Sequence, residues 1–393
     1  AYRTKKEHLE AMLNSVSKQS YPHWELIVAD AGGTAESVQA WAKKNGICLR
    51  KAADTSNLAE WKDQSIMLCT LSENKGISAN TNAGIELAAG DAVGLLDHDD
   101  LLTANALWEM ADCLEKEKKR GKQKLVLFSD EDKCDGAASR FYEPNFKPDF
   151  DGELLLTNNY ICHFTVIETA FLKELKLRSG FDGAQDYDLM LRAYAAGGQF
   201  VHVPKVLYHW RCHEASTASN PRSKRYAYEA GQRALEDYCL RKGWKATVSG
   251  LKHLGFYRED YEDSVFCQRP EIGIWAKPLP GGRDIFGIRH PKGFLVSGLY
   301  ENDGLMRYAG LRKGYSGPMH RAALQQSAPA ADLRSMEVCS ALKERYAQTI
   351  AELKEACQGL PTAAQETKIL QKSMEFCKEA TAAGYGILWD PQA

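Results

Sequence analysis

The chain has 393 residues, of which 44% are hydrophobic and 26% are charged, a composition typical of a globular protein with two or three domains. Its net charge of −2 and its pI of about 6.6 provide no basic surface, so we expect no nucleic-acid partner. No apolar run approaches the roughly 20 residues that cross a bilayer, and the charged start of the chain does not resemble a signal peptide.

Eleven cysteines are scattered between Cys48 and Cys377, and none of them forms a C-x-x-C pair. An odd number of cysteines at irregular spacing favours neither a disulfide framework nor a structural zinc site. We therefore expect reduced thiols and a cytoplasmic setting.

The first 120 residues alternate amphipathic segments with short apolar runs. Apolar residues at helical spacing predict helices over 5–18, 37–46, 77–90 and 103–119. Apolar runs that end in polar residues predict strands over 24–30, 66–72 and 91–97. This alternation of strand and helix predicts an α/β fold with a mostly parallel sheet that carries helices on both faces.

Polar residues stand where three of these predicted strands end, at Asp30, at Glu73–Asn74 and at Asp97–Asp100. Ligands of open parallel sheets bind beyond the carboxyl ends of the strands. We therefore expect the three strand ends to converge on one crevice that holds a ligand.

The acidic segment LLDHDD, residues 95–100, crowds three carboxylates at one strand end. Asp97 and Asp99 suit a hard divalent cation, Mn²⁺ or Mg²⁺, and Mg²⁺ commonly completes its coordination with water and substrate phosphates. This pattern is typical of a site for a nucleotide diphosphate. For Asp100 alone, a helix cap is an equally good interpretation.

Two later segments carry further candidates. In GAQDYDL, residues 183–189, Asp186 and Asp188 occupy the first turn of a predicted helix, where a carboxylate complements the helix dipole or serves as a general base. In HVPKVLYHWR, residues 202–211, His209 is either a metal ligand or a core residue. Lys205 or Arg211 could bind phosphate.

An amphipathic helix over residues 222–243 closes the first predicted domain, which spans residues 1–245. The remainder, 246–393, predicts a smaller α+β region. Residues 184–206 align without gaps on 371–393, and both read as a helix, a glycine stop and a short strand. A duplicated element and two unrelated units both explain this echo.

Six segments resemble family 2 glycosyltransferases, particularly bacterial enzymes of cell-surface polysaccharide synthesis that are often described as rhamnosyltransferases. They lie in order between residue 1 and about residue 245: AYRTKKEHLEAMLNSVSKQSYPHWELIVADAG, NKGISANTNAGIELAAGDAVGLLDHDD, FSDEDK, EPNFKPDF, GAQDYDLMLR and VPKVLYHWR. The resemblance implies a GT-A (Rossmann-like) fold, a nucleotide-sugar donor, a divalent metal and inversion at the anomeric carbon. It also implies a glycan or a lipid-linked acceptor, which would place the protein at the inner face of the plasma membrane.

The resemblance assigns roles to single positions. It implies that Asp186 is the catalytic base, although Gln185 replaces the family's usual glutamate. The implied nucleotide-sugar site consists of Asp30, Asn74, Gly76, Asn82, Asp97 and Arg211. The implied metal ligands are Asp97, Asp99 and His209. In the family the first strand begins before AYR, so either the chain was cut or its sheet lacks part of a central strand.

Residues 246–393 resemble pieces of a second transferase module, but they contain no D-x-D like that at 97–99, and Ser373 aligns with Asp186. We expect a degenerate module that binds the acceptor, a partner module or another subunit, which leaves a homo-oligomer and peripheral membrane association open. The alternative for the whole chain is a non-catalytic nucleotide-binding or glycan-binding module. A nucleotidyltransferase is a weaker rival, since it shares the α/β sheet and metal-binding acids.

Overall fold

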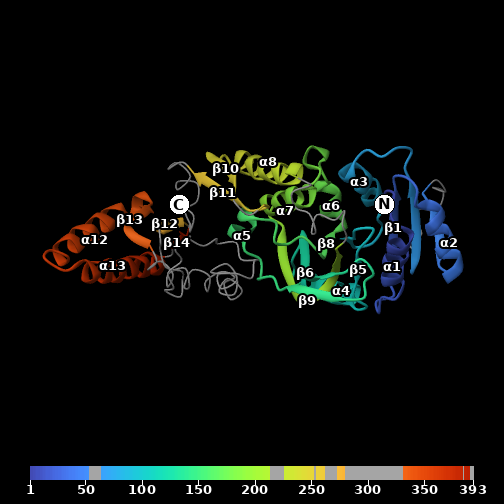
Figure 1. Cartoon of the computed structure of the whole chain (residues 1–393), viewed down its shortest axis with the longest axis horizontal. Helices are drawn as coiled ribbons and strands as arrows, with labels where there is room; N and C mark the ends of the chain where they lie inside the picture. Colours follow the sequence, from blue (N-terminus) through green and yellow to red (C-terminus); the bar gives the residue numbers. More distant parts are fainter. Residues whose placement is uncertain are drawn as a thin grey trace. The chain divides into compact units, whose positions relative to one another are not determined.

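The computed structural model describes residues 1–52, 63–212, 225–251, 254–261, 272–278, 331–383 and 385–389. The chain forms two compact units (Figure 1). The first contains Ala1–Lys147, Asn159–Tyr238 and Val248–Arg258, and the second contains Pro148–Asn158, Cys239–Thr247 and Glu259–Ala393. Residues 148–158 and 239–245 thus group with the second unit, and residues 248–258 with the first. The division into domains 1–245 and 246–393 stays a prediction.

The first unit begins with a parallel three-stranded sheet. Its strands are, in spatial order, β1 (Glu25–Asp30), β3 (Ser65–Thr70) and β2 (Cys48–Lys51). Val28 joins the core formed with α1 (Lys6–Ser17) and α2 (Ala35–Asn45). Ile27, on the opposite side of the strand, lies against Gly84 of α3 (Ile77–Leu87). Because neighbouring strand residues point to opposite faces, helices cover both faces of this sheet, as the sequence predicts.

The second sheet of the first unit is mixed. Its spatial order is β4 (Ala92–Leu95), β8 (Thr165–Glu168), β6 (Leu125–Cys134), β9 (Gln199–Arg211) and β5 (Leu101–Leu102), with β7 (Phe141–Asn145) beside β6. Strands β6 and β9 are parallel, and the other pairs are antiparallel. The helix-flanked α/β class is confirmed.

One detail differs from the strand–helix alternation. Strand β4 does not continue the first parallel sheet but pairs with β8, which comes from the irregular stretch after residue 140. Another contact that the sequence did not indicate joins the start of the chain to the end of β1. The Ala31 amide donates to the Ala1 carbonyl at 2.9 Å, and the Ala1 ammonium donates to the Ala29 carbonyl at 2.5 Å. Periodicity locates a strand but does not choose its neighbour, so this pairing could not be predicted.

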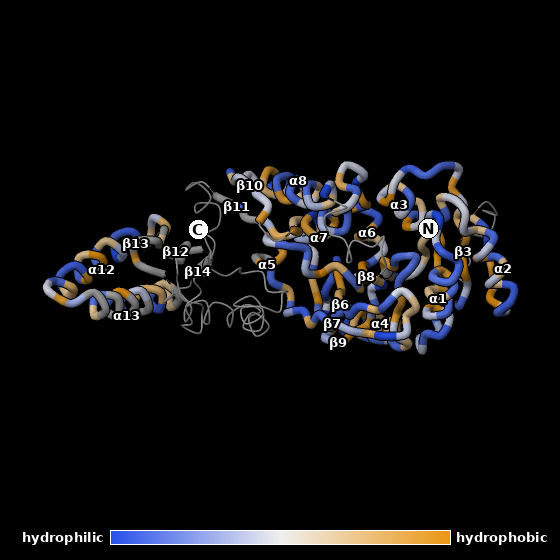
Figure 2. Tube along the Cα trace, in the orientation of Figure 1, coloured by the Kyte–Doolittle hydropathy of each residue, from blue (hydrophilic) through white to orange (hydrophobic). Residues whose placement is uncertain are grey.

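The remaining elements of this part of the chain are mainly helical. They are α4 (Ala106–Lys119), α6 (Thr169–Leu175), the 3-10 turn η2 (Ser179–Phe181), α7 (Gln185–Ala195) and α8 (Arg225–Arg241), followed by the strand pair β10 (Ala246–Gly250) and β11 (Tyr257–Tyr261). Hydrophobic and hydrophilic residues alternate along these helices (Figure 2), as burial of one helix face requires. Among the described helices of the chain, none combines the length and the apolar character that a membrane span needs.

The second unit contains a three-stranded sheet with β12 (Ile272–Pro278) in its centre, antiparallel to β13 (Ala331–Val338) and parallel to β14 (Gly386–Trp389). The unit also contains α5 (Gly152–Thr157), η5 (Ser340–Leu342), α12 (Lys343–Ala356) and α13 (Thr362–Ala382). The last two helices share a buried core with β13. The α+β character predicted for the C-terminal region is therefore confirmed. Its Gly- and Pro-rich stretch, residues 265–318, lies outside the described residues except for 272–278.

The aligned segments 184–206 and 371–393 are only partly similar in structure. Both copies form a helix followed by a strand, α7 with β9 and α13 with β14. Asp186, however, lies in the first turn of α7, whereas Ser373 is buried in the middle of α13 and donates to the Ile369 carbonyl. The two positions therefore differ in structure as well as in chemistry.

A buried acid anchors α7. The Asp188 carboxylate accepts hydrogen bonds from Arg178 Nε at 3.1 Å and from Arg192 Nε at 2.9 Å, and its side chain is 1% exposed. Arg178 also donates to Asp237 of α8 at 2.6 Å. Asp188 therefore links η2, α7 and α8 and is fully engaged in doing so.

We expect Asp188→Asn to lower the free energy of unfolding by about 3 kcal/mol, because it leaves two arginines without their buried counter-charge. Urea denaturation followed by tryptophan fluorescence would measure this loss. Asp112→Asn is a matched control, since Asp112 pairs with Lys116 on the surface, and its effect should stay within about 0.5 kcal/mol. Equal effects of the two substitutions would contradict the anchoring role.

Candidate active site

The acidic segment lies between β4 and β5, and Asp100 is its buried member. Asp100 is 1% exposed, and its Oδ2 accepts from the Tyr208 hydroxyl at 2.6 Å while its Oδ1 accepts from the Arg211 amide at 2.7 Å. Helix α4 begins only at Ala106, with Asn105 at its N-cap position. The helix-cap interpretation of Asp100 is therefore wrong: the carboxylate binds strand β9 instead.

Asp97, Asp100 and His163 offer ligand atoms that all lie within 4.8 Å of one another. We call these three residues the cation group. The carboxylates supply the hard oxygen ligands that Mg²⁺ and Mn²⁺ prefer, and an imidazole nitrogen is also a ligand for first-row metals. This donor set fits a divalent cation.

The other two predicted metal ligands lie elsewhere. Asp99 faces His98, with 3.8 Å between Oδ1 and Nδ1. His209 Nδ1 lies 2.5 Å from Asp132 Oδ1, and the two residues stand opposite each other in the β6–β9 pairing. Because neighbouring residues of a strand point to opposite faces, β9 cannot direct both Tyr208 and His209 toward Asp100. Of the predicted metal ligands, only Asp97 belongs to the cation group.

His163 was not predicted, since a single histidine in an irregular stretch gives no signal. Its ring stacks on Tyr208, with 4.6 Å between centroids and 12° between planes, and its centroid lies 6.1 Å from that of Trp210. Tyr208 therefore contacts two members of the cation group, His163 through its ring and Asp100 through its hydroxyl.

The cation group has an unfavourable charge balance. Burial raises the pKa of Asp100 well above its usual value, and the negative charges of Asp97 and Asp99 raise it further. Burial also raises the pKa of Tyr208, with additional contributions from Asp100 and Asp97. A bound cation would relieve this repulsion and favour the ionised carboxylates.

Asp186 is available for chemistry, unlike Asp188. Its Oδ2 accepts from Asn159 Nδ2 at 2.8 Å and lies 3.9 Å from the Cys162 sulfur. Burial raises the pKa of Asp186, and the charge of Asp97 adds to this, whereas His163 and backbone amides act in the opposite direction. Asp186 thus lies within electrostatic reach of the cation group, and a raised pKa makes its carboxylate a stronger base.

Arg211 is a buried residue that binds the backbone of the acidic segment. It is 2% exposed, and its Nε donates to the Asp99 carbonyl at 2.5 Å while its Nη1 donates to the Gly136 carbonyl at 2.8 Å. Its Nη2 has no hydrogen-bond partner within the described part of the chain. Lys205, the other phosphate candidate, instead pairs with Glu109 at 2.6 Å.

The predicted nucleotide-binding residue Asp30 ends strand β1, and its carboxylate binds the turn that leads into helix α2. It accepts hydrogen bonds from the Gly32, Thr34 and Ala35 amides at 3.0–3.2 Å and from the Thr34 hydroxyl at 2.5 Å. Burial acts to raise the pKa of Asp30, but these hydrogen bonds outweigh it and the pKa is lowered. Asp30 therefore stays ionised as a cap of α2.

Of the other predicted nucleotide-binding residues, Asn74 and Gly76 precede α3 and Asn82 lies within it. Asn74 Oδ1 accepts from the Gly76 amide at 3.1 Å, and Gly76 has a φ of 96° and is so close to the Asp182 carboxylate that a Cβ would collide with it. The Asn82 side chain exchanges two hydrogen bonds of 2.8 Å with the Leu177 backbone. These contacts order the loop, and nucleotide binding by the three residues stays a prediction.

Comparison with known proteins shows which families and proteins part of this sequence resembles. The family described as Glycosyl transferase family 2 matches residues 1–175. The uncharacterized protein y4gI of Sinorhizobium fredii is 36% identical over 61% of this chain and 24% of its own length. The O-antigen biosynthesis protein RfbC of Myxococcus xanthus is 34% identical over 61% of this chain and 18% of its own length.

The chain thus spans a quarter or less of the length of these two relatives. Among solved structures, S. aureus TarS 1–349 in complex with UDP-GlcNAc is similar at 14% identity and a TM-score of 0.45, with 98% of this chain and 91% of that chain covered. By sequence, residues 1–175 of the chain are similar to glycosyl transferase family 2.

Proposed function

We propose that the first unit is an inverting glycosyltransferase that moves a sugar from a nucleotide-diphosphate donor to a glycan or a lipid-linked acceptor in cell-surface polysaccharide synthesis. The observation that carries this proposal is the position of Asp186, a carboxylate with a raised pKa, within electrostatic reach of the cation group. The family match and the similarity to RfbC, an O-antigen biosynthesis protein, support the same class of reaction.

In the proposed reaction, Asp186 accepts the proton of the acceptor hydroxyl. The hydroxyl oxygen then forms a bond to the anomeric carbon on the face opposite the donor diphosphate, and the bond from that carbon to the diphosphate oxygen breaks. The Asn159 side chain orients the Asp186 carboxylate through its 2.8 Å hydrogen bond. The leaving group departs as the nucleoside diphosphate with the bonding electron pair.

Asp97, Asp100 and His163 would hold Mn²⁺ or Mg²⁺. Asp99 precedes Asp100 in the chain, and the Arg211 side chain donates to the Asp99 carbonyl. When bound, such a cation would offset the charge that develops on the diphosphate. The unpartnered Nη2 of Arg211 supports a part for this residue near the same charge. Asp30, Asn74, Gly76 and Asn82 remain the proposed nucleotide-binding residues.

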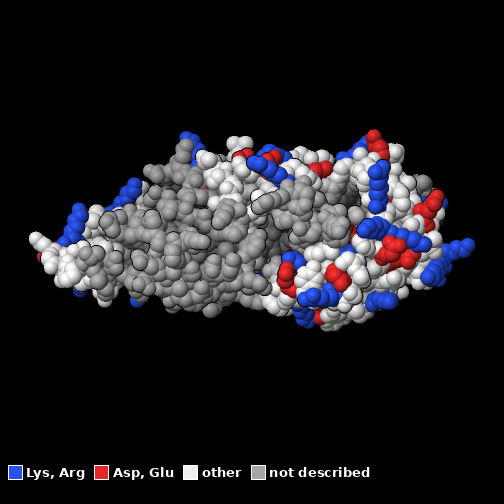
Figure 3. Space-filling view, in the orientation of Figure 1, with Lys and Arg blue, Asp and Glu red and all other residues white. Residues whose placement is uncertain are grey.

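A lipid-linked acceptor would place the protein at the inner face of the membrane. In Figure 3, Lys and Arg side chains on the visible face of the first unit lie beside Asp and Glu rather than in a basic patch. This mixture favours recognition of the acceptor by individual groups over attraction by a broad electrostatic field.

A thermal-shift screen of nucleotides and nucleotide sugars tests the donor class and the cation together. We expect UDP, dTDP or GDP species to raise Tm in the presence of Mn²⁺ or Mg²⁺, and EDTA to abolish the shift, because the cation links the acids to the diphosphate. Asp97→Asn should weaken this cation dependence. A response to nucleoside triphosphates alone would favour a nucleotidyltransferase instead.

We expect Asp186→Asn to lower kcat about 10²- to 10⁴-fold and to leave nucleotide affinity within a factor of about two, because a general base acts in the transition state. Turnover of donor sugar and calorimetric titration with nucleotide would measure the two effects. Asp91→Asn is a control that removes an exposed carboxylate at the start of β4. Normal turnover by the Asp186 variant would exclude its role as the base.

The raised pKa of Asp186 predicts a pH dependence. The base must be ionised, so turnover should fall on acidification at a pH above the value of about 3.9 for an unperturbed aspartate. Asn159→Ala removes a hydrogen bond to the ionised carboxylate, so the acid limb of the kcat profile should move to still higher pH. A shift of that limb to lower pH would contradict the assignment.

A further inference from the structure

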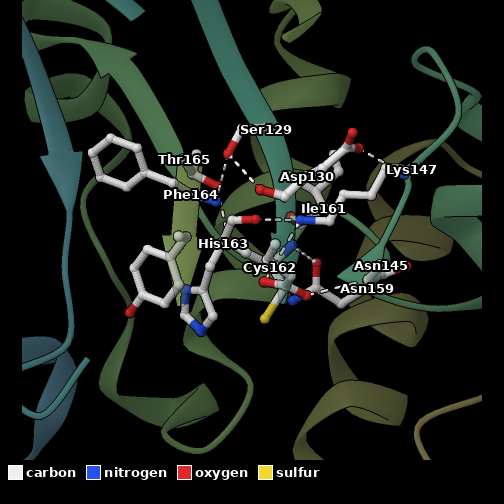
Figure 4. Close-up of polar contacts among 12 residues, drawn as sticks. Ser129, Asp130, Asn145, Lys147, Asn159, Ile161, Cys162, His163, Phe164 and Thr165 are labelled. Atoms are coloured by element: carbon white, nitrogen blue, oxygen red, sulfur yellow. Dashed lines mark hydrogen bonds and ion pairs between the residues drawn. The ribbon is translucent and has the colours of Figure 1, made fainter. Parts of the chain in front are cut away.

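Lys147 is a completely buried lysine in the motif EPNFKPDF, and the proposed reaction does not use it. An ammonium group removed from water is costly unless its donors and its charge are satisfied. The Lys147 Nζ donates to the Ile161 carbonyl at 2.6 Å and to the His163 carbonyl, as Figure 4 shows. Glu131 supplies the counter-charge, with its Oε2 at 3.7 Å from Nζ.

Both carbonyls belong to one short stretch of backbone, residues 159–165, which we call the bridging segment. Its side chains serve the site: Asn159 donates to Asp186, and His163 belongs to the cation group. The bridging segment is joined to β6 at its far end, where the Ser129 amide donates to the Phe164 carbonyl at 3.1 Å. Lys147 binds this segment at Ile161, which lies between the two functional residues, and at His163 itself.

Lys147 is itself fixed from a second direction. Its backbone amide donates to Asp130 Oδ1 at 2.8 Å, and Asn145 donates to Glu131 Oε1 at 3.3 Å. Asp130 and Glu131 are neighbouring residues of β6 and are 1% and 7% exposed. The ammonium group is therefore held by the central strand of the sheet, and the sheet determines where the bridging segment lies.

From this geometry we infer that Lys147 is a positioning residue that acts through the Ile161 and His163 carbonyls. It sets the distance between Asn159, which binds Asp186, and His163, which belongs to the cation group. The inference rests on the proposed function for its effect on turnover. A purely structural role would stabilise the whole sheet and would not separate turnover from donor binding.

The test compares Lys147→Met with the double variant Lys147→Met/Glu131→Gln. The double variant removes both charges together, so no buried charge remains unpaired and the fold should survive. Lys133→Met is the matched control, because Lys133 lies on β6, the strand of Glu131, but pairs with Glu143 at the surface. All variants are made in the full chain.

We expect the double variant to lose about 10²-fold in kcat with donor KM within about threefold of the unaltered protein, because small misplacements of catalytic groups have effects of this size. Amide hydrogen exchange of residues 159–165 should accelerate at least about tenfold, and alkylation of Cys162 should become faster. Lys133→Met should change none of these quantities.

The inference is overturned if the folded double variant keeps its kcat, if exchange of residues 159–165 does not change, or if exchange rises equally throughout the sheet. The proposed function fails separately, if the unaltered protein transfers no sugar from any donor with Mn²⁺ or Mg²⁺. In that event, faster exchange confined to residues 159–165 would still support the positioning of this segment by Lys147.

Discussion

The site depends on one buried carboxylate, that of Asp100, which binds both the backbone and a side chain of β9. Asp100 lies in the segment that follows β4, whereas Tyr208 and Arg211 lie more than a hundred residues later. This contact therefore brings the acidic segment onto the sheet. The side chain of Arg211 completes the connection by donating to the Asp99 carbonyl.

Placing the acidic segment there creates a repulsion between carboxylates that a bound cation would relieve. Asp97 is exposed while Asp100 is buried, and burial together with the charges of Asp97 and Asp99 raises the pKa of Asp100. Burial is the main cause of the raised pKa of Asp186, His163 lowers this pKa, and the charge of Asp97 raises it further. The proposed base thus differs from the acidic segment in the main origin of its electrostatics, and the two are linked through Asp97 and His163.

The sequence could predict the strand-end acids, because an apolar run that stops at carboxylates specifies both the strand and its end. It could also select the first turn of α7 but not decide between Asp186 and Asp188, which have the same relation to the helix dipole. Their partners decide: two arginines bind Asp188, whereas Asn159 binds Asp186. Such partners lie far away in sequence and leave no local pattern.

The choice of histidine illustrates the same limit. His209 stands in a recognisable motif, but strand parity directs it to Asp132, and the adjacent Tyr208 reaches the acids instead. His163 has no motif and enters the cation group because its ring stacks on Tyr208. A prediction from sequence alone would have needed the register of β9 against β5 and β6, which long-range pairing determines.

His163 is held at two points by residues of different elements. Tyr208 of β9 stacks on its ring, and Lys147, which follows β7, binds its backbone carbonyl. A ring stack alone permits sliding in its plane, and a carbonyl contact alone permits rotation of the side chain, so each contact removes a freedom that the other leaves. The buried ion pair of Lys147 and Glu131 therefore has a structural role. Lys147 fixes the backbone at His163, where no strand or helix does so.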